Sequence, residues 1–480
     1  MNHKKSPHFH FSQKNNWMND PNGLIKVEDV YHLFFQSNPI DKNWGNIGWG
    51  HATSNDLVTW EKMPEALYAD EKVMIFSGSA ITSNNTLGLD ERLIAFYTAC
   101  EYSCDEDSNF TVKKQTQNIA YSDNSGTNWK HYPDNPIIDI NSAEFRDPKV
   151  IKLSDYLWLM LVTRARDFEI DFYLSNNLVE WSLKSSFSDC RFRKGAWECP
   201  DLIHVSINEK SKYILTISVD NGFKSGGSGV LYIIGDYNDG YFTKDTSIMG
   251  NDDYRVLDKG PDFFASQSFY NDDANEPPTI VGWLNNWKYA KDMPDKELPL
   301  LQSVPRQLSL ISDTNNKILL KQIPTQHIDK YTYRLAYHND ILMTPMVPVT
   351  LKCVPGCFIY NAQFLQTKDA SLSIVVSNKF AHIFTIKINE SFTNLTISRR
   401  KSEAFGQHVN EFSTEFSPLN DLLDIKIIVD YFCVEIFIND FTEVFTMHLG
   451  EYFEEVDICT STNESKLLVK TISVACPLIS

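Results

Sequence analysis

Three acidic residues stand in local settings that could support chemistry. Asp20 lies in residues 17–23 (WMNDPNG), Asp147 lies in residues 145–148 (FRDP), and Glu198 follows a tryptophan and precedes Cys-Pro. Cleavage of an acetal bond needs one carboxyl group with a raised pKa that donates a proton, and a second carboxylate that stays ionised. An Asp-Pro pair taken alone is ordinary turn chemistry. Three acids that each lie close to a tryptophan or an arginine weaken that structural interpretation, and their spacing leaves a glycosidase and a structural role both open.

The neighbours of each acid suggest its role. The tryptophan before Glu198 provides an apolar setting, which penalises the charged form and suits a proton donor. The proline after Asp20 and the Asn-Gly turn at 22–23 predict a carboxylate at a strand end, in polar surroundings that keep it ionised. Arg146 should keep Asp147 charged, as a fixed acceptor for sugar hydroxyls. Six tryptophans suit a sugar-stacking pocket: Trp17, Trp44, Trp49, Trp197, Trp283 and Trp287.

The elements around these motifs predict an all-β chain. Short segments rich in β-branched and aromatic residues alternate with polar turns, and extended 3.6-residue periodicity is nearly absent. In the first 310 or so residues the predicted strands include 30–36, 92–99, 156–164, 213–219 and 279–285. In the last third they include 371–377, 382–388, 425–431, 433–438 and 466–474.

A weak internal repeat favours a β-propeller for the first part of the chain. Residues 54–60 (SNDLVTW) resemble residues 175–181 (SNNLVEW), and residues 122–129 form a looser third copy. A strand, a polar turn and a tryptophan at such intervals are what four-stranded blades would produce. The alternative is a common hairpin turn that recurs by accident.

Composition shifts divide the chain into three parts. We expect a β-propeller over residues 1–320, a polar connecting segment over 321–345, and a β-sandwich over 346–480. The middle segment is predicted as a connection because it is polar and contains Pro324 and Pro345.

Charge and composition exclude several classes of protein. Acidic residues outnumber basic ones, 62 against 44, which gives a net charge of −18. Phosphate backbones should repel such a chain, so we expect no nucleic-acid partner. No apolar run is long enough to span a membrane, and the polar first residues suggest a cytoplasmic protein, or a secreted one whose signal was removed. The nine cysteines show no zinc-ligand spacing and are interpreted mostly as buried free thiols.

In sequence and in order, the acidic motifs resemble glycoside hydrolase family 32, the β-fructofuranosidases that include invertases, exo-inulinases and levanases. Residues 17–23 match its nucleophile motif, residues 145–148 its transition-state stabiliser motif, and residues 198–202 (ECPDL) its acid/base motif. Further similar segments extend over nearly the whole chain: Phe34–Gln36, Trp44–Gly45, Trp49–Ala52, Phe76–Ser79, Asp262–Gln267, Gly282–Trp287, Pro305–Arg306, Val429–Asp430 and Val434–Phe437.

The resemblance implies a five-bladed propeller joined to a C-terminal sandwich, with the active site in the funnel at the propeller axis. Asp20 would be the nucleophile, Glu198 the acid/base and Asp147 the stabiliser of a retaining reaction. That reaction would release fructose from terminal β-D-fructofuranosides, in sucrose or in fructans such as inulin and levan. No metal or cofactor is implied, and a homodimer through the sandwich is possible. The implied substrate-binding residues are Asn19, Gln36, Trp44, Phe76, Ser77, Arg146 and Trp287.

Departures from the family pattern and rival functions remain. Residues 293–299 replace a stretch that in many members contains Trp-Arg, so the preference for the leaving group is open. Asp rather than Glu in WMNDPNG argues against an endo-acting inulinase, and residues 285–290 look like the exo-fructanase branch. Rivals are a fructosyltransferase of the same family, a non-catalytic fructan-binding protein, and a sialidase, whose Asp box residues 122–129 partly fit, with Asn124 at the Asp position.

Overall fold

The computed structural model describes residues 6–13, 15–104, 110–123, 126–271, 276–367, 369–406, 410–463 and 465–478. Within these residues the chain is all-β, as the sequence predicts. Helical segments are short: α1 (Thr246–Met249) and the 3-10 turns η1 (Ala290–Asp292), η2 (Pro294–Lys296) and η3 (Gln326–Tyr331). None of the helices among these residues is long or apolar enough to cross a membrane.

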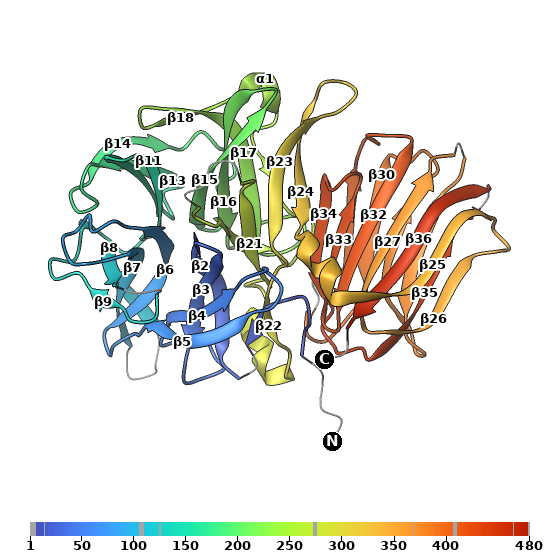
Figure 1. Ribbon diagram of the computed structural model, residues 1–480, viewed down its shortest axis with the longest axis horizontal. Helices are drawn as coiled ribbons and strands as arrows, with labels where there is room; N and C mark the ends of the chain where they lie inside the picture. The colour runs from blue at the N-terminus through green and yellow to red at the C-terminus, as the bar shows by residue number, and fades with distance from the viewer. Residues whose placement is uncertain are drawn as a thin grey trace.

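Residues 12–324 form five antiparallel sheets, grouped on the left of Figure 1. The first contains β2 (Trp17–Val27), β3 (Val30–Asn38), β4 (Gly48–Ser54) and β5 (Glu61–Leu67). The second contains β6 (Val73–Thr82), β7 (Leu93–Cys104), β8 (Phe110–Ser122), β9 (Lys130–His131) and β10 (Ile138–Ser142). The third contains β11 (Phe145–Ser154), β12 (Leu157–Arg164), β13 (Glu169–Ser175) and β14 (Ser182–Phe187).

The fourth and fifth sheets continue this pattern. The fourth contains β15 (Trp197–Ile207), β16 (Lys210–Val219), β17 (Gly229–Asn238), β18 (Tyr241–Lys244) and β19 (Arg255–Val256). The fifth contains β20 (Phe264–Ser268), β21 (Thr279–Leu284), β22 (Leu300–Gln302), β23 (Arg306–Ser312) and β24 (Ile318–Pro324), with β1 (Ser12–Gln13) from the start of the chain paired to β22.

One strand of each sheet contacts its counterparts in cyclic order. We call β2, β6, β11, β15 and β20 the inner strands. β2 contacts β6, β6 contacts β11, β11 contacts β15, β15 contacts β20, and β20 contacts β2 again. Each inner strand also carries a β-bulge against its partner, and bulges re-aim side chains next to active sites. The inner strands therefore lie next to one another, and each has a bulge that changes the direction of its side chains.

The sequence repeat marks the connection between the third and fourth strands of three sheets. Residues 54–60 join β4 to β5, and residues 175–181 join β13 to β14. In both, a serine hydroxyl accepts a hydrogen bond from the leucine N–H three residues later, at 2.8 Å for Ser54 and 2.9 Å for Ser175. The third copy follows β8, and its residues 124–125, including the Asn124 of the sialidase comparison, lie outside the described residues.

Residues 332–477 form two six-stranded sheets, on the right of Figure 1. In one the order is β25 (Thr332–Met343), β36 (Leu467–Pro477), β27 (Cys357–Leu365), β32 (Leu422–Asp430), β33 (Cys433–Ile438), β34 (Glu443–His448). In the other it is β26 (Val349–Pro355), β35 (Glu455–Ser461), β28 (Leu372–Ser377), β29 (His382–Ile388), β30 (Asn394–Arg399), β31 (Glu411–Glu415). Apolar side chains from both sheets form one buried cluster, and buried and half-exposed residues alternate along β28, as one-sided burial requires.

The strands predicted from the sequence correspond to β3, β7, β12, β16, β21, β28, β29, β32, β33 and β36. The segment 321–345 differs from its prediction as a connection, because most of it is strand. It contains the end of β24, η3 and all of β25, which pairs with β36 along its length. β25 is the last strand of its sheet and is largely exposed. An exposed edge strand has the polar composition of a linker, which explains the difference.

A buried network of charges joins the fifth sheet and the N-terminal segment to β32 and β33. We call Arg306, Asp258, Glu435, His10 and Asp430 the junction network. Arg306 contacts Asp258 at 2.9 Å and Glu435 at 2.5 Å, and His10 lies between Asp430 at 2.9 Å and Glu435 at 3.0 Å. All five side chains are fully buried. Backbone N–H groups of residues 8–10 also donate to Asp430.

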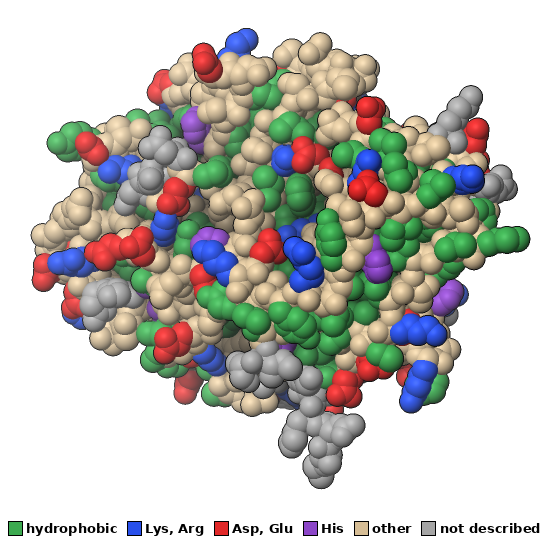
Figure 2. All heavy atoms as spheres, turned by 45° about the vertical axis from the view of Figure 1, so that its right-hand side comes forward, with side chains coloured by type: hydrophobic (Ala, Val, Ile, Leu, Met, Phe, Trp, Pro, Cys, Tyr) green, Lys and Arg blue, Asp and Glu red, His purple; other side chains and the backbone are tan. Residues whose placement is uncertain are grey.

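Charges of both signs are interspersed over the surface that Figure 2 shows, without a broad basic patch on that face. All nine cysteines are free, and six of them are buried: Cys100, Cys190, Cys199, Cys357, Cys433 and Cys476. The prediction that most are buried thiols is therefore confirmed.

Candidate active site

The three predicted acids lie at the bulges of three inner strands. The pairing shifts between Met18 and Pro21 around Asp20 in β2, between residues 146 and 149 around Asp147 in β11, and between residues 198 and 201 next to Glu198 in β15. Asp147 has φ +66°, a left-handed conformation that is uncommon outside glycine. The irregular backbone at these positions thus sets the directions of the three carboxyl groups, which differ from those that regular strand pairing would give.

Asp20 is 8% exposed and is held by three donors. Ser77 Oγ of β6 donates to its Oδ2 at 2.8 Å, Asn19 Nδ2 donates to its Oδ1 at 3.0 Å, and Cys199 Sγ lies 3.6 Å from Oδ2. Burial raises the pKa of Asp20, although these hydrogen bonds oppose the shift. The expected polar turn at a strand end is wrong, because β2 continues through Asn22-Gly23 to Val27 and buries the carboxyl group.

A relay of amides and hydroxyls extends from Asp20 into the first sheet. In the orientation that satisfies its hydrogen bonds, the Asn22 amide accepts from Gln36 Nε2 at 3.0 Å and donates to Ser77 Oγ at 3.2 Å. Ser77 then donates to Asp20. The acceptor side of Asn19 is fixed by Trp17 Nε1 at 2.7 Å. Asn19 and Ser77 therefore orient the Asp20 carboxylate directly, and Trp17, Asn22 and Gln36 hold those two residues in place.

Asp147 is 5% exposed, and backbone groups determine its position. Its Oδ2 accepts from the N–H of Cys199 at 2.8 Å, and its own N–H donates to Thr98 Oγ1 at 2.9 Å. Burial raises the pKa of Asp147 to about 6, against the attraction of Arg146 and with repulsion from Asp20. Arg146 therefore does not keep this group as acidic as predicted, because burial has the larger effect.

Arg146 instead binds Glu198. Its Nε and Nη2 donate to Glu198 Oε1 at 3.1 and 2.9 Å, while its Nη1 donates to Glu144 Oε2 at 2.7 Å and lies 3.4 Å from Gln115 Oε1. Burial raises the pKa of Glu198 to about 8, with Arg146 opposing the shift and Asp147 adding to it. Glu198 has the raised pKa that the sequence predicts for a proton donor.

Cys199 is the residue that brings the three acids together. It follows Glu198 in β15, its N–H donates to Asp147, and its thiol contacts Asp20. Its φ of +45° belongs to the bulge of that strand. Repulsion from Asp20 contributes to the raised pKa values of both Glu198 and Asp147, and repulsion from Asp147 adds to that of Glu198. One buried cluster of carboxyl groups, built from three sheets, follows from these contacts.

Sequence reasoning missed several residues of this cluster. Thr98 of β7 and Gln115 of β8 are buried and orient Asp147 and Arg146, and Glu144 balances the charge of Arg146. No short motif marks them. The available signal was a polar side chain inside an otherwise apolar strand, as in residues 93–100 (LIAFYTAC), which requires a buried hydrogen-bond partner.

Of the six tryptophans expected around a sugar pocket, only Trp44 and Trp287 are half-exposed. Trp287 stacks on Trp17, with ring centroids 6.0 Å apart, and Trp44 packs against Phe76. The other four are fully buried core residues: Trp17, Trp49, Trp197 and Trp283. The prediction of six stacking tryptophans is wrong, because large aromatic residues are also what a wide all-β core needs.

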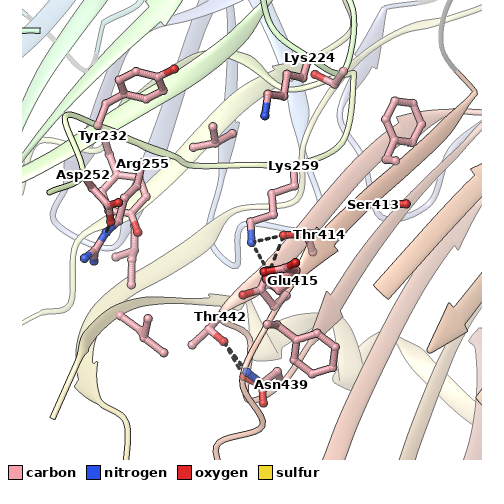
Figure 3. Close-up of a pocket in the computed structure, with 18 of the residues that line it drawn as sticks. Lys224, Tyr232, Asp252, Arg255, Lys259, Ser413, Thr414, Glu415, Asn439 and Thr442 are labelled. Carbon is pink, nitrogen blue, oxygen red and sulfur yellow. Dashed lines mark hydrogen bonds and ion pairs between the residues drawn. The ribbon is translucent and has the colours of Figure 1, made fainter. Parts of the chain in front are cut away.

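A large cavity in the described part of the chain lies away from these acids. It has a volume of about 1320 Å³ and lies between residues 222–225, residues 252–259 and β31. Figure 3 shows its lining, where Lys259 Nζ donates to Thr414 Oγ1 at 3.0 Å. None of the three acids lines it. We place the candidate active site at the acid cluster, because the raised pKa values and the convergent donors occur there.

Within the described residues, no group of three or more His, Cys, Asp or Glu is arranged to hold a metal ion. A buried cluster of one proton-holding acid and two further carboxyl groups is the kind of site that glycoside hydrolases use. The chain belongs to glycosyl hydrolases family 32: residues 10–324 match the N-terminal domain of that family and residues 346–449 match its C-terminal domain.

Relatives and solved structures agree with this membership. A levanase of Bacillus subtilis is 33% identical in an alignment of 468 residues that covers 92% of this chain and 65% of the levanase. An extracellular exo-inulinase of Aspergillus niger is 36% identical in an alignment of 346 residues that covers 66% of this chain and 64% of that protein. The chain thus spans less than two thirds of the length of these two relatives. An invertase of Debaryomyces hansenii is 30% identical over 503 residues, covering 95% of this chain and 91% of the invertase.

Among solved structures, an exo-inulinase from Aspergillus awamori superposes with a TM-score of 0.87 at 26% identity, covering 99% of both chains. A fructofuranosidase from Schwanniomyces occidentalis, in complex with fructosylnystose, superposes with a TM-score of 0.86 at 28% identity, covering 98% of this chain and 97% of that one.

Proposed function

We propose that the chain is a retaining, exo-acting β-fructofuranosidase that releases fructose from the non-reducing ends of sucrose or of fructans. The observation that carries this proposal is the gathering of Asp20, Asp147 and Glu198 around Cys199, with the pKa of Glu198 raised to about 8. A glycosidase needs such a protonated acid near neutral pH beside a second carboxyl group. The relatives named levanase, exo-inulinase and invertase support fructosides as substrates.

In the proposed reaction Asp20 attacks C2 of the terminal fructosyl unit while Glu198 donates its proton to the leaving oxygen. A covalent fructosyl-enzyme forms, and the ionised Glu198 then removes a proton from water, which releases fructose and regenerates Asp20. Asp147 accepts hydrogen bonds from fructosyl hydroxyls. For such a retaining pair we expect the carboxyl groups of Asp20 and Glu198 to lie about 5–5.5 Å apart in the substrate complex.

The residues around the acids would bind the fructosyl unit. Arg146, held by Glu198 and Glu144, has its position fixed on both sides. Trp44 and Trp287 offer the half-exposed aromatic surfaces. With the orienting residues around Asp20, the proposed binding set is Asn19, Gln36, Trp44, Phe76, Ser77, Arg146 and Trp287.

We propose a five-bladed propeller for the first five sheets and a sandwich for the last two. The cyclic contacts of the inner strands support the propeller, as does the pairing of β1 with β22, which joins the start of the chain to the fifth sheet. The shared apolar cluster of the two six-stranded sheets supports the sandwich. A homodimer through the sandwich stays a prediction, which sedimentation would check against the 55.1 kDa chain. A cytoplasmic location also stays a prediction.

The direct test is a product profile on sucrose, raffinose, inulin and levan, with the anomeric form of the first fructose followed by NMR. We expect free fructose as the first product, released in the β configuration. Glu198→Ala should lose turnover by orders of magnitude on these substrates. Longer oligosaccharides from concentrated sucrose would indicate a fructosyltransferase instead. If no fructoside is cleaved, the proposed function is wrong.

A further inference from the structure

A row of four half-exposed aromatic side chains leads away from the acid cluster. Phe76 packs against Trp44 with centroids 6.5 Å apart, Trp44 against Phe110 at 5.3 Å, and Phe110 against Tyr102 at 5.3 Å. All four are partly accessible to solvent. We call these residues the aromatic row.

The row begins at the candidate nucleophile. Phe76 lies in β6, directly before the Ser77 that donates to Asp20, and its carbonyl oxygen accepts from Trp49 Nε1 at 3.0 Å. The other end belongs to the hairpin of β7 and β8, where Tyr102 pairs with Val112. The row therefore connects the acid cluster with the outer part of the second sheet.

The turns η1 and η2 border this row, and η2 lies in the segment 293–299 that departs from the family pattern. The ammonium group of Lys291, in η1, lies 5.0 Å from the centre of the Trp44 ring. Lys42, two residues before Trp44, forms an ion pair with Asp295 of η2 at 2.7 Å. Met293, between the two turns, is fully buried and fixes them to the core. Polar donors and acceptors thus adjoin the apolar surface of the row.

Such a surface suits a ligand that is a neutral sugar chain, rich in hydroxyl groups. Aromatic rings pack against the C–H faces of sugars, and nearby charged groups can bind their hydroxyls. The net charge of −18 disfavours an anionic polymer. Because the row continues directly from the acid cluster, its occupant is the continuation of the molecule that is bound there.

We propose that Phe110 and Tyr102 bind the second and third fructosyl units of a fructan whose terminal unit lies at the acids. This inference rests on the proposed function and adds a preference for chains over sucrose. Sucrose ends one sugar unit beyond the scissile bond, so it reaches the start of the row only. A longer fructan contacts the whole row.

The test compares Phe110→Ala and Tyr102→Ala with the parent chain on sucrose, kestose, nystose and inulin. These residues do not contact the reacting atoms, so their loss should weaken binding without changing the chemical step. We expect KM for nystose and inulin to rise about three- to tenfold in each variant, with kcat unchanged. Both constants for sucrose should stay at the parent values.

Phe110→Trp, which keeps an aromatic ring, should restore KM for inulin. Tyr241→Ala is the matched control, because Tyr241 is an exposed aromatic residue of β18 in another sheet. Thermal unfolding of each variant shows whether it is folded. If Phe110→Ala does not fold, Phe110→Leu replaces it in the test, because leucine keeps apolar volume at this position.

Equal changes of KM on sucrose and inulin, or no change on either, would overturn the inference while leaving the proposed function intact. If the parent cleaves no fructoside, calorimetry on Asp20→Asn separates the two proposals. Nystose should bind Asp20→Asn more tightly than it binds Asp20→Asn/Phe110→Ala, and equal affinities would overturn the aromatic row as a subsite.

Discussion

The acid cluster and the junction network both bury carboxyl groups beside an arginine, yet their pKa values shift in opposite directions. Burial raises the pKa of Glu198 to about 8 and that of Asp147 to about 6, since one guanidinium faces several acids. In the junction network burial acts in the same direction on Asp430 and Glu435. There, hydrogen bonds and charges from His10 and Arg306 outweigh it and hold both pKa values below the usual range.

The direction of the pKa shift is therefore decided by the number of hydrogen-bond donors and cations around each acid, because burial is common to both regions. The junction network stabilises its charges, as a structural element requires. The acid cluster leaves its carboxyl groups short of compensation, which costs folding free energy and produces groups that exchange protons near neutral pH. Four predictions test this contrast.

The largest difference is expected between Asp20→Asn and Asp430→Asn. Asn at position 20 keeps the size of the side chain but cannot form the covalent ester, so kcat should fall by on the order of 10⁴-fold or more, with little change in Tm. Asp430→Asn should lower Tm and leave kcat per folded molecule close to the parent value. Sucrose hydrolysis and thermal unfolding measure both. Fructose release by Asp20→Asn at the parent rate would disprove the assignment of the nucleophile.

Glu435→Gln should be the most destabilising single change in the comparison. It leaves Arg306 and His10 buried with less negative charge, and breaking a buried ion pair costs about 3–5 kcal/mol. The urea midpoint and Tm at pH 7 should fall, while kcat/KM of the folded protein is unchanged. Glu390→Gln, at an exposed position, is the control. A midpoint equal to that of the control would mean that the junction network does not stabilise the fold.

Glu198→Gln should stabilise the protein while abolishing efficient turnover. Folding raises the pKa of this carboxyl group above its value in the unfolded chain, which is about 4.3. Its contribution to the stability of the fold is therefore complete at pH values below about 4.3. That contribution is lost as the pH rises toward the folded pKa of about 8. Since Gln stays neutral, its advantage over the parent should be absent at pH 4 and reach on the order of 2 kcal/mol at pH 7.

Thermal unfolding of Glu198→Gln and the parent between pH 4 and pH 8 measures this difference. Glu390→Gln again serves as the control, with a pH-independent offset from the parent expected. A Tm difference for Glu198→Gln that shrinks as the pH rises would show that Glu198 is stabilised as an anion, like Glu435.

The contrast also shows what the sequence could predict. The all-β class, ten strands and the three acids follow from short-range patterns, because alternation and the motifs around Asp20 and Glu198 are local in the chain. The exposed strand β25 was not predicted, since a polar edge strand has the composition of a linker. The junction network and the contacts of Thr98 depend on residues up to 425 positions apart, as between His10 and Glu435, and no local pattern encodes them.

Trp197 and Arg146 show a second limit. The sequence correctly predicts an apolar setting for Glu198, but it assigns Arg146 to its neighbour Asp147, whereas the guanidinium binds Glu198 of another sheet. Adjacent residues on a bulged strand need not point the same way, so sequence proximity is a poor guide to side-chain partners at such sites.

The smallest expected effect tests how Arg146 is shared. Glu144 Oε2 accepts from Arg146 Nη1 at 2.7 Å, and its side chain is 43% exposed. In Glu144→Gln less negative charge opposes the guanidinium, so the ionised form of Glu198 is favoured and its pKa should fall. The alkaline limb of the kcat/KM profile, set by the proton donor, should move to lower pH by about 0.3–0.5 units, a modest shift because solvent screens Glu144.

Glu169→Gln, beside Arg164 in the third sheet, removes a similar arginine partner and should leave the limb in place. An alkaline limb that stays fixed or moves upward in Glu144→Gln would show that the charge of Arg146 is not what sets the proton affinity of Glu198.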